Sequence, residues 1–301
     1  MKYHYLCGMK KMILWASVVM LVVAGCAQSA EKQYVRKAVR MMDKDGLFAE
    51  GMEWETARSA ALATEPASMD EAYDVVREAL KVAGGKHSFL WTKDQMEERA
   101  AEDEATAPSV VLLEGDIAVI TLPRFSGQTQ DENRRYARTV LDALPESLSG
   151  VVIDLRGNTG GNMYPMIAAV HRFLPDDKIL RFKSRKFNMP VTKDYVLRTV
   201  DIEAQAQIDC PVAILTDGNT ASSGEATLLC FRGLDYARSF GAPTAGYASA
   251  NQPKTLPDGS RLVLTTSCDV ARTGEIFCDD PIAPDVETGQ PLEDALAWLR
   301  Q

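Results

Sequence analysis

Histidine and cysteine are scarce in this chain. Of the 301 residues, three are histidine and six are cysteine. No His-x-x-x-His pattern and no pair of Cys-x-x-Cys motifs occurs. Protein zinc sites need three or four closely placed His, Cys or carboxylate ligands. We therefore expect no metal site, and we expect no other cofactor.

Basic side chains are also few relative to acidic ones. The chain has 33 Lys and Arg against 42 Asp and Glu, which gives a formal net charge of −9. No basic patch or stripe of the kind that neutralises nucleic-acid phosphates is present, so we expect no nucleic-acid partner. Internal repeats and low-complexity tracts are absent too. The length suffices for one large α/β core with a smaller helical module.

No apolar run is long enough to span a bilayer comfortably. Residues 12–23 follow three lysines and form an apolar core of about 12 residues, the pattern of a signal peptide. The segment Leu21-Val22-Val23-Ala24-Gly25-Cys26 resembles the bacterial lipobox, in which the cysteine is lipidated and becomes the first mature residue. We expect residues 1–25 to be a lipoprotein signal peptide and Cys26 to anchor an exported protein of the bacterial cell envelope to a membrane, facing the periplasm or the exterior. Ordinary cleavage after a residue such as Ser29 is the alternative.

The chain does contain a strand, a tight loop and a helix in immediate succession. The apolar residues 151–155 predict a buried strand, residues 156–161 the loop, and residues 163–174 the helix. Gly160 and Gly161 let backbone amides approach another group closely, as an oxyanion hole requires, although close packing alone would also favour glycine. A phosphate-binding loop is disfavoured because no Lys-Ser or Lys-Thr follows the glycines.

A second such unit places Ser222 at the turn between an apolar strand, residues 212–215, and a new helix. Unpaired amides and the helix dipole favour a developing negative charge at a helix start, so the Ser222 hydroxyl is placed for nucleophilic attack. Ser222 and Glu225 also spell a capping box, which satisfies helix-start amides without any chemistry. The unit alone leaves both interpretations open.

Four segments in order resemble successive motifs of the carboxy-terminal processing (tail-specific) serine peptidases and of the tricorn protease core. They are Asp154-Leu155-Arg156-Gly157-Asn158-Thr159-Gly160-Gly161-Asn162-Met163, Thr220-Ala221-Ser222-Ser223-Gly224-Glu225, Gly241-Ala242-Pro243-Thr244-Ala245-Gly246 and Pro284-Asp285. The resemblance covers about residues 70–290.

The resemblance implies an α/β fold with a ClpP/crotonase-like core of stacked ββα units, which we assign to residues 108–301. A small N-terminal helical module, residues 26–107, would carry the loop with His87. The resemblance also implies a serine peptidase with Ser222 as nucleophile, and with the amides of Gly160 or Gly161 and of Ser223 as the oxyanion hole.

Members of this family with a Ser-Lys mechanism carry a lysine where this chain has Tyr247. A phenol is a poor general base at neutral pH, and the nearby Lys254 is better explained as a solvated loop charge. His171 lies within a helical pattern and is better explained as a structural residue. His87 follows Gly84-Gly85, where a helix ends, and Lys86-His87-Ser88 resembles the motif that supplies the catalytic histidine in the tricorn-like branch.

We therefore predict that His87 is the general base. We expect Tyr247 and Asn251 to contact the substrate.

The group that orients the histidine is the least determined part of the predicted site. Tricorn-like enzymes have a glutamate where this chain has Cys278. Candidates in the same region are Asp269, Glu275, Asp279 and Asp280, of which we favour Asp280, while a Ser-His pair without a third group stays open.

Two functions remain from different classes. One is a serine endopeptidase of the cell envelope that hydrolyses unfolded proteins or peptides through an acyl-enzyme on Ser222. The interval between His87 and Val110 is too short for the PDZ domain that many processing proteases insert there. The other is an inactive lipoprotein that binds peptides or hydrophobic ligands, as retinoid-binding relatives of this family do.

The cysteines give one further expectation. Cys268 and Cys278 could staple the loop between them, and buried thiols are the alternative.

Overall fold

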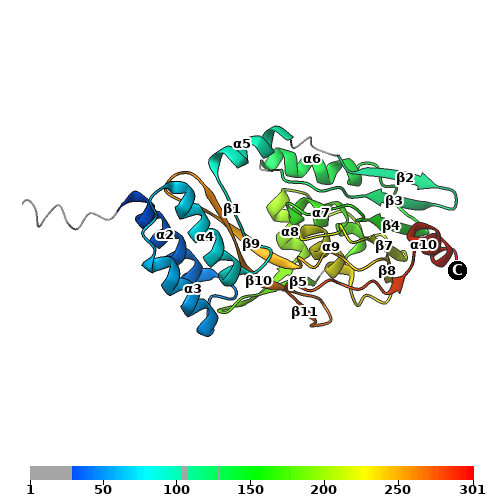
Figure 1. Ribbon diagram of the computed structural model, residues 1–301. Coiled ribbons are helices and arrows are strands. Elements are labelled where there is room, and N and C mark those ends of the chain that lie inside the picture. Colours follow the sequence, from blue (N-terminus) through cyan, green and yellow to red (C-terminus); the bar gives the residue numbers. More distant parts are fainter. Residues whose placement is uncertain (1–28, 103–106, 128, 176) are drawn as a thin grey trace, which may run out of the picture.

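The computed structural model describes residues 29–102, 107–127, 129–175 and 177–301 (Figure 1). The predicted signal peptide and Cys26 lie outside these residues. Within the described ranges, no helix combines the length and the apolar character that crossing a membrane would require.

The larger core is built on a six-stranded sheet in the order β12-β8-β7-β4-β3-β2, parallel except for the β2–β3 pair. Its strands are β2 (Ser109–Leu113), β3 (Ile117–Thr121), β4 (Gly150–Asp154), β7 (Val212–Thr216), β8 (Ala237–Gly241) and β12 (Val286–Glu287). The central strands β4 and β7 are short apolar runs buried on both faces, as parallel strands usually are. Because they are adjacent and parallel, the loops that follow them emerge side by side at one edge of the sheet.

Helices cover both faces of this sheet. Alternate strand residues such as Val151 and Ile153 pack with helices on one face, whereas Val152 packs on the other. The first face is covered by α6 (Gln130–Leu141), α7 (Met163–Ala169) and α9 (Ser223–Phe231), with α8 (Lys193–Val200) against α7, and the second face by α10 (Pro291–Leu299). The result is the layered α/β core that the sequence predicts.

A second sheet is antiparallel throughout and is organised around the long strand β10. It contains β1 (Phe89–Trp91), β5 (Lys178–Lys183), β6 (Asn188–Thr192), β9 (Ser249–Thr255), β10 (Arg261–Val270) and β11 (Ile276–Phe277). β10 pairs with β1 near its start and with β5 near its end, and β9 runs along most of its length. Residues 26–107 and 108–301, which the sequence separates, therefore contribute strands to one sheet.

The N-terminal part of the chain forms α2 (Ala30–Asp45), α3 (Gly51–Ala63), α4 (Met69–Gly84) and α5 (Lys93–Glu102). Helices α2, α3 and α4 lie together at one end of the molecule, and α5 extends from there toward α6 (Figure 1). The first three pack into one apolar cluster with Leu262 and Leu264 of β10. From the β5–β6 turn, Arg185 donates to the backbone oxygens of Asp43 and Ala49. The module is thus attached to the core by a shared sheet and by the hydrogen bonds of Arg185.

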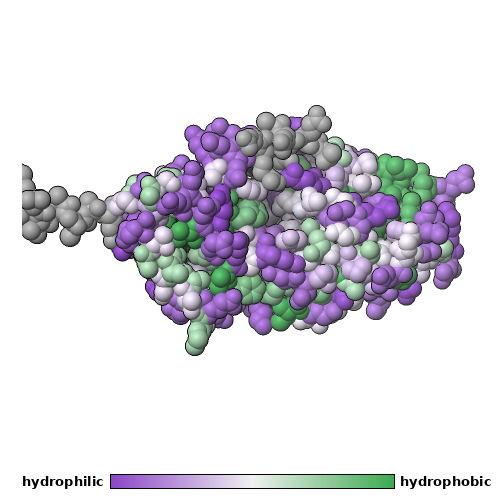
Figure 2. Space-filling model, in the orientation of Figure 1, coloured by the Kyte–Doolittle hydropathy of each residue, from purple (hydrophilic) through white to green (hydrophobic). Residues whose placement is uncertain are grey.

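Most of the surface in view is hydrophilic or mixed, with an apolar area where β2 lies (Figure 2). Val111 and Leu112 of β2 are both more than half exposed.

One helix is shorter in the structure than the sequence predicts. Residues 163–174 form α7 and then a separate 3-10 turn, His171–Phe173. The ring of His171 is fully buried, with Nδ1 near the Ala168 carbonyl and Nε2 accepting from the Gln205 amide, and the Arg172 guanidinium donates to three backbone oxygens. These contacts compete with continued helix, and they confirm His171 as a structural residue.

Candidate active site

Ser222 occupies a strained turn between β7 and α9. Its backbone has φ 53° and ψ −113°, which is outside the regions that a residue with a Cβ normally adopts. The turn is held from outside, because the Ala221 amide donates to the Asn158 backbone oxygen and the Thr220 hydroxyl donates to the Leu155 backbone oxygen. Strain of this kind persists only where surrounding contacts impose it, and it is concentrated at functional sites.

Glu225 ties this turn to a second loop. Its buried carboxylate accepts from the amides of Ser222 (2.7 Å), Gly246 (2.9 Å) and Tyr247 (2.8 Å) and from the Thr244 hydroxyl. Burial raises the pKa of Glu225, and these four donors oppose the rise. The capping interpretation of Glu225 and a functional one are therefore compatible, since the same side chain bonds the helix start and fixes the loop that carries Tyr247.

The glycine loop after β4 reaches Ser222 directly. A Cβ on Gly160 would lie 2.8 Å from the Ser222 Cβ, and one on Gly161 would lie 2.0 Å from the Phe125 backbone oxygen. Both residues also have positive φ, +99° and +121°. No other residue type fits at either position without movement of the backbone.

The two glycine amides differ in their partners. The Gly160 amide donates to Oδ1 of the buried Asn158 at 2.8 Å. Within the described part of the chain, the amides of Gly161 and Ser223 donate to no acceptor. Of the predicted glycine pair, the structure thus leaves Gly161 available, together with Ser223, for an oxyanion. Asn158 was not identified from the sequence, although it lies inside the glycine motif.

His87 lies in the loop between α4 and β1, and its ring is largely buried. Nδ1 is 2.8 Å from the Ser249 hydroxyl, and the ring packs edge-on against Tyr247 with centroids 5.2 Å apart. Burial, and then the charge of Lys86, lowers the pKa of His87 to about 4. The imidazole is therefore neutral at neutral pH, as a general base must be.

The backbone around His87 is also fixed. Asn251 donates from its side chain to the His87 backbone oxygen at 3.0 Å and accepts from the Thr265 hydroxyl at 2.7 Å. Ser249 and Asn251 are alternate residues of β9, so both face the His87 loop, and Tyr247 lies in the turn that leads into this strand. Tyr247 and Asn251, which we predicted to contact the substrate, thus contact His87 in the described structure.

Ser222 and His87 are connected through two residues, Glu225 and Tyr247. Within the described residues, Ser222 and His87 form no direct hydrogen bond. Glu225 binds the backbone amides of both Ser222 and Tyr247, and the Tyr247 ring packs on His87. Catalytic hydrogen bonds are often long before substrate binds, so this geometry is compatible with a Ser-His pair.

The structure gives no support to Asp280 as the group that orients His87, because Ser249 lies at Nδ1 and Asp280 is exposed. The backbone of Asp280 and Pro281 passes close to Gly246. Of the other candidates, Asp269 is buried on β10, and Glu275 pairs with Arg232. Asp279 lies against Gly85.

A disulfide joins Cys268 to Cys278, which confirms that expectation, while Cys210 and Cys230 are buried free thiols. In the ranges that the structure describes, no three His, Cys, Asp or Glu side chains cluster as metal ligands would.

Comparison with known proteins gives consistent results. The model of peptidase family S41 matches residues 116–288. The nisin-resistance protein of Lactococcus lactis subsp. lactis is 33% identical over 282 residues, which cover 89% of this chain and 87% of that protein. A carboxy-terminal-processing protease of Bartonella bacilliformis is 27% identical over 181 residues, but the match covers 60% of this chain and 40% of the protease.

Solved structures show the same architecture. A lipoprotein from Streptococcus agalactiae superposes with a TM-score of 0.82 at 31% identity, covering 91% of this chain and 97% of the other. The photosystem II D1 C-terminal processing protease superposes with a TM-score of 0.59 at 15% identity, over 91% and 98% of the two chains, which shows a common fold. The predicted α/β, ClpP/crotonase-like fold class is confirmed.

Proposed function

Because this chain belongs to peptidase family S41, we propose that it is an active serine endopeptidase with Ser222 as nucleophile and His87 as general base. The family implies a peptide or protein substrate. The observation that supports the proposal most directly is the strained Ser222, which lies against the glycine loop and is tied through Glu225 and Tyr247 to a buried neutral histidine.

In the proposed mechanism, His87 Nε2 takes the proton of the Ser222 hydroxyl as Oγ attacks the peptide carbonyl carbon. In this mechanism the Nδ1–H of His87 donates to the Ser249 hydroxyl, which leaves Nε2 as the basic nitrogen. The amides of Gly161 and Ser223 bind the oxyanion, and each such donor is worth about 3 kcal/mol in other enzymes. His87 then gives its proton to the leaving amine, and water hydrolyses the acyl-enzyme with His87 again as base.

We propose a peptide such as nisin as the substrate to try first. The Lactococcus protein is named for nisin resistance, and its similarity extends through the N-terminal module as well as the peptidase core. Matches to the carboxy-terminal-processing proteases cover a smaller part of the chain.

We further propose that the protein is an exported lipoprotein of the cell envelope, anchored through Cys26. The lipobox-like segment and the similarity to a streptococcal lipoprotein support this location. Replacing Cys26 with Ala should move the protein from the membrane fraction to the soluble fraction.

The alternative is a binding protein that keeps the fold without the chemistry. It is favoured by Tyr247 at the position of the lysine in Ser-Lys relatives and by the lack of a direct Ser222–His87 hydrogen bond among the described residues.

Labelling with a fluorophosphonate separates the two functions. The soluble chain from residue 27 onward should label at Ser222 and cleave members of a peptide panel that includes nisin, with products identified by mass spectrometry. Ser222→Ala and His87→Ala should do neither, while Ser147→Ala, which removes an exposed hydroxyl, should behave as the wild type. A folded wild type that neither labels nor cleaves would reject the peptidase and leave the binding protein.

A further inference from the structure

We propose that Asp279 is a positioning residue for His87, held in place by the Cys268–Cys278 disulfide. Asp279 lies in residues 278–282, which we call the strap. The strap connects the disulfide, the His87 loop and the loop that Glu225 ties to Ser222. The inference rests on the proposed function, and it adds a residue that acts through His87 without touching the substrate.

The first end of the strap is fixed to β10. Strand β11 pairs with the end of β10, with Phe277 opposite Asp269, and the disulfide from Cys278 to Cys268 follows immediately. Asp279 is the next residue along the chain. A carboxylate one residue from a covalent crosslink has little freedom to move away from its neighbours.

Asp279 faces the turn that leads into His87. Its Oδ2 lies 2.6 Å from the place where a Cβ on Gly85 would stand, and Gly85 has φ +67°. Burial raises the pKa of Asp279, while the Lys86 backbone amide and the Lys86 ammonium act in the opposite direction. The carboxylate therefore interacts with the two residues that immediately precede His87.

The position of Asp279 is costly without such a role. Its Oδ1 is buried and has no hydrogen-bond partner among the described residues. An unpartnered buried carboxylate oxygen destabilises a fold, and natural chains keep such groups chiefly where they serve a site.

The other end of the strap reaches the Ser222 side of the site. The Thr244 amide donates to the Ile282 backbone oxygen at 3.1 Å, and the Ile282 amide donates to the Thr244 hydroxyl at 2.8 Å. That same hydroxyl donates to Glu225, which also binds the Ser222 amide. The strap thus fixes both halves of the proposed catalytic pair relative to one crosslinked segment.

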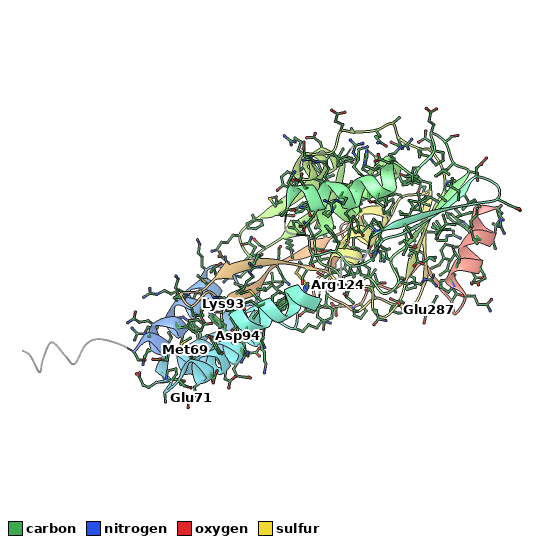
Figure 3. All side chains as sticks on the ribbon, turned by 90° about the horizontal axis from the view of Figure 1, so that it is seen from above. Met69, Glu71, Lys93, Asp94, Arg124 and Glu287 are labelled. Carbon is green, nitrogen blue, oxygen red and sulfur yellow. A yellow bond between two sulfur atoms is a disulfide. The ribbon has the colours of Figure 1, made fainter. Side chains whose placement is uncertain are left out.

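The test compares Asp279→Ala with Asp279→Asn, which keeps an oxygen acceptor toward the Lys86 amide. Glu287→Ala is the control, since it removes an exposed carboxyl of β12, far from the N-terminal helices (Figure 3). For each variant, kcat, KM and the pH profile are measured on a cleaved peptide, per fluorophosphonate-titrated site. Hydrogen exchange of residues 84–90 is followed in parallel by mass spectrometry.

We expect Asp279→Ala to lower kcat by about 10- to 100-fold with KM nearly unchanged, because a displaced base misaligns proton transfer. Loss of the carboxylate should also shift the acid limb of kcat/KM. Residues 84–90 should exchange faster, and Asp279→Asn should recover most of kcat. The double variant Cys268→Ser/Cys278→Ser should show the same kcat and exchange changes, and adding Asp279→Ala to it should cost little more, since both act on one element.

Wild-type kcat in Asp279→Ala, or unchanged exchange of residues 84–90, would overturn the proposal. If the wild type cleaves no peptide, the proposed function fails. Hydrogen exchange then decides the inference alone, because faster exchange in Asp279→Ala supports the positioning role and unchanged exchange rejects it.

Discussion

At the scale of single residues, the environment of His87 determines what the site can do. A histidine in water titrates near pH 6.5, whereas burial first and Lys86 second lower the pKa of His87 to about 4. The group keeps its basic nitrogen free across the neutral range, and it is a weaker base than an exposed imidazole. The oxyanion that forms beside it during reaction would favour the protonated ring, so the low pKa belongs to the resting enzyme.

The pH dependence of kcat/KM tests this directly. In the free enzyme His87 takes up a proton only as the pH falls to about 4. We therefore expect kcat/KM to rise with pH through that region and to be constant from about pH 5.5 upward. Lys86→Met removes the second cause of the shift, so the acid limb should move toward higher pH. Measurement of kcat/KM between pH 3.5 and 8 on enzyme that stays folded decides the matter, and a limb near 6.5 in the wild type would contradict it.

Folding stability should change in the same window. The unfolded chain binds a proton at His87 near pH 6.5, and the folded chain does so only near 4. The unfolded state therefore gains stability relative to the folded one as pH falls from about 6.5 to about 4.

At the scale of elements, the loop after β4 and the turn before α9 act as one unit. Gly160 shows this best, because its Cα faces Ser222 and its φ is +99°. A methyl group there would stand 2.8 Å from the Ser222 Cβ, so either the turn or the loop must shift.

We predict that Gly160→Ala lowers kcat by at least about 100-fold, because Ser222 leaves its alignment with the oxyanion donors. Gly157→Ala is the matched control, since Gly157 also has positive φ but would place its Cβ in open space. It should cost about 1 kcal/mol of stability through strain alone and should keep its activity. Equal losses of kcat in the two variants would show that strain, and not contact with Ser222, is the cause.

The elements also show which features the sequence could predict. Residues 151–155 and 212–215 are apolar runs bounded by turn residues, and they form β4 and β7 as expected. The end of α4 at Gly84 follows from the glycine pair. Local pattern determines such features.

Local sequence pattern could not predict the contacts between segments that are far apart in the chain. Ser249 meets His87 across 162 residues of sequence, and β1 joins β10 across a similar interval. The preference for Asp280 gains no support for the same reason, since an acidic residue near a motif in sequence need not face the histidine in space. Alternation along β9 would have placed Ser249 on the same face as Asn251, had that strand been assigned to the His87 loop.

At the scale of the whole molecule, helices α2, α3 and α4 share a buried apolar cluster with strand β10. Leu262 and Leu264 of β10 are fully buried, and their partners are apolar residues of α2, α3 and α4. Met69 and Glu71 of α4 and Lys93 and Asp94 of α5 lie toward one end of the molecule, Glu287 lies toward the other, and Arg124 lies between them (Figure 3). The long strand β10 continues from one part into the other, so loss of the helices would expose apolar surface on a strand that the catalytic side also uses.

We therefore predict that Leu264→Ala destabilises the entire chain by about 2–5 kcal/mol, the usual cost of truncating a fully buried leucine. Two variants that each keep a single tryptophan report on the two ends of the molecule by fluorescence. One keeps Trp54 in α3, and the other keeps Trp298 in α10. In urea both signals should move to the same lower midpoint, and loss of fluorophosphonate labelling should coincide with them. Residues 108–301 expressed alone should be insoluble, since they leave Leu262 and Leu264 uncovered. If Leu264→Ala moved the Trp54 transition and left that of Trp298 in place, the two parts would be independent domains.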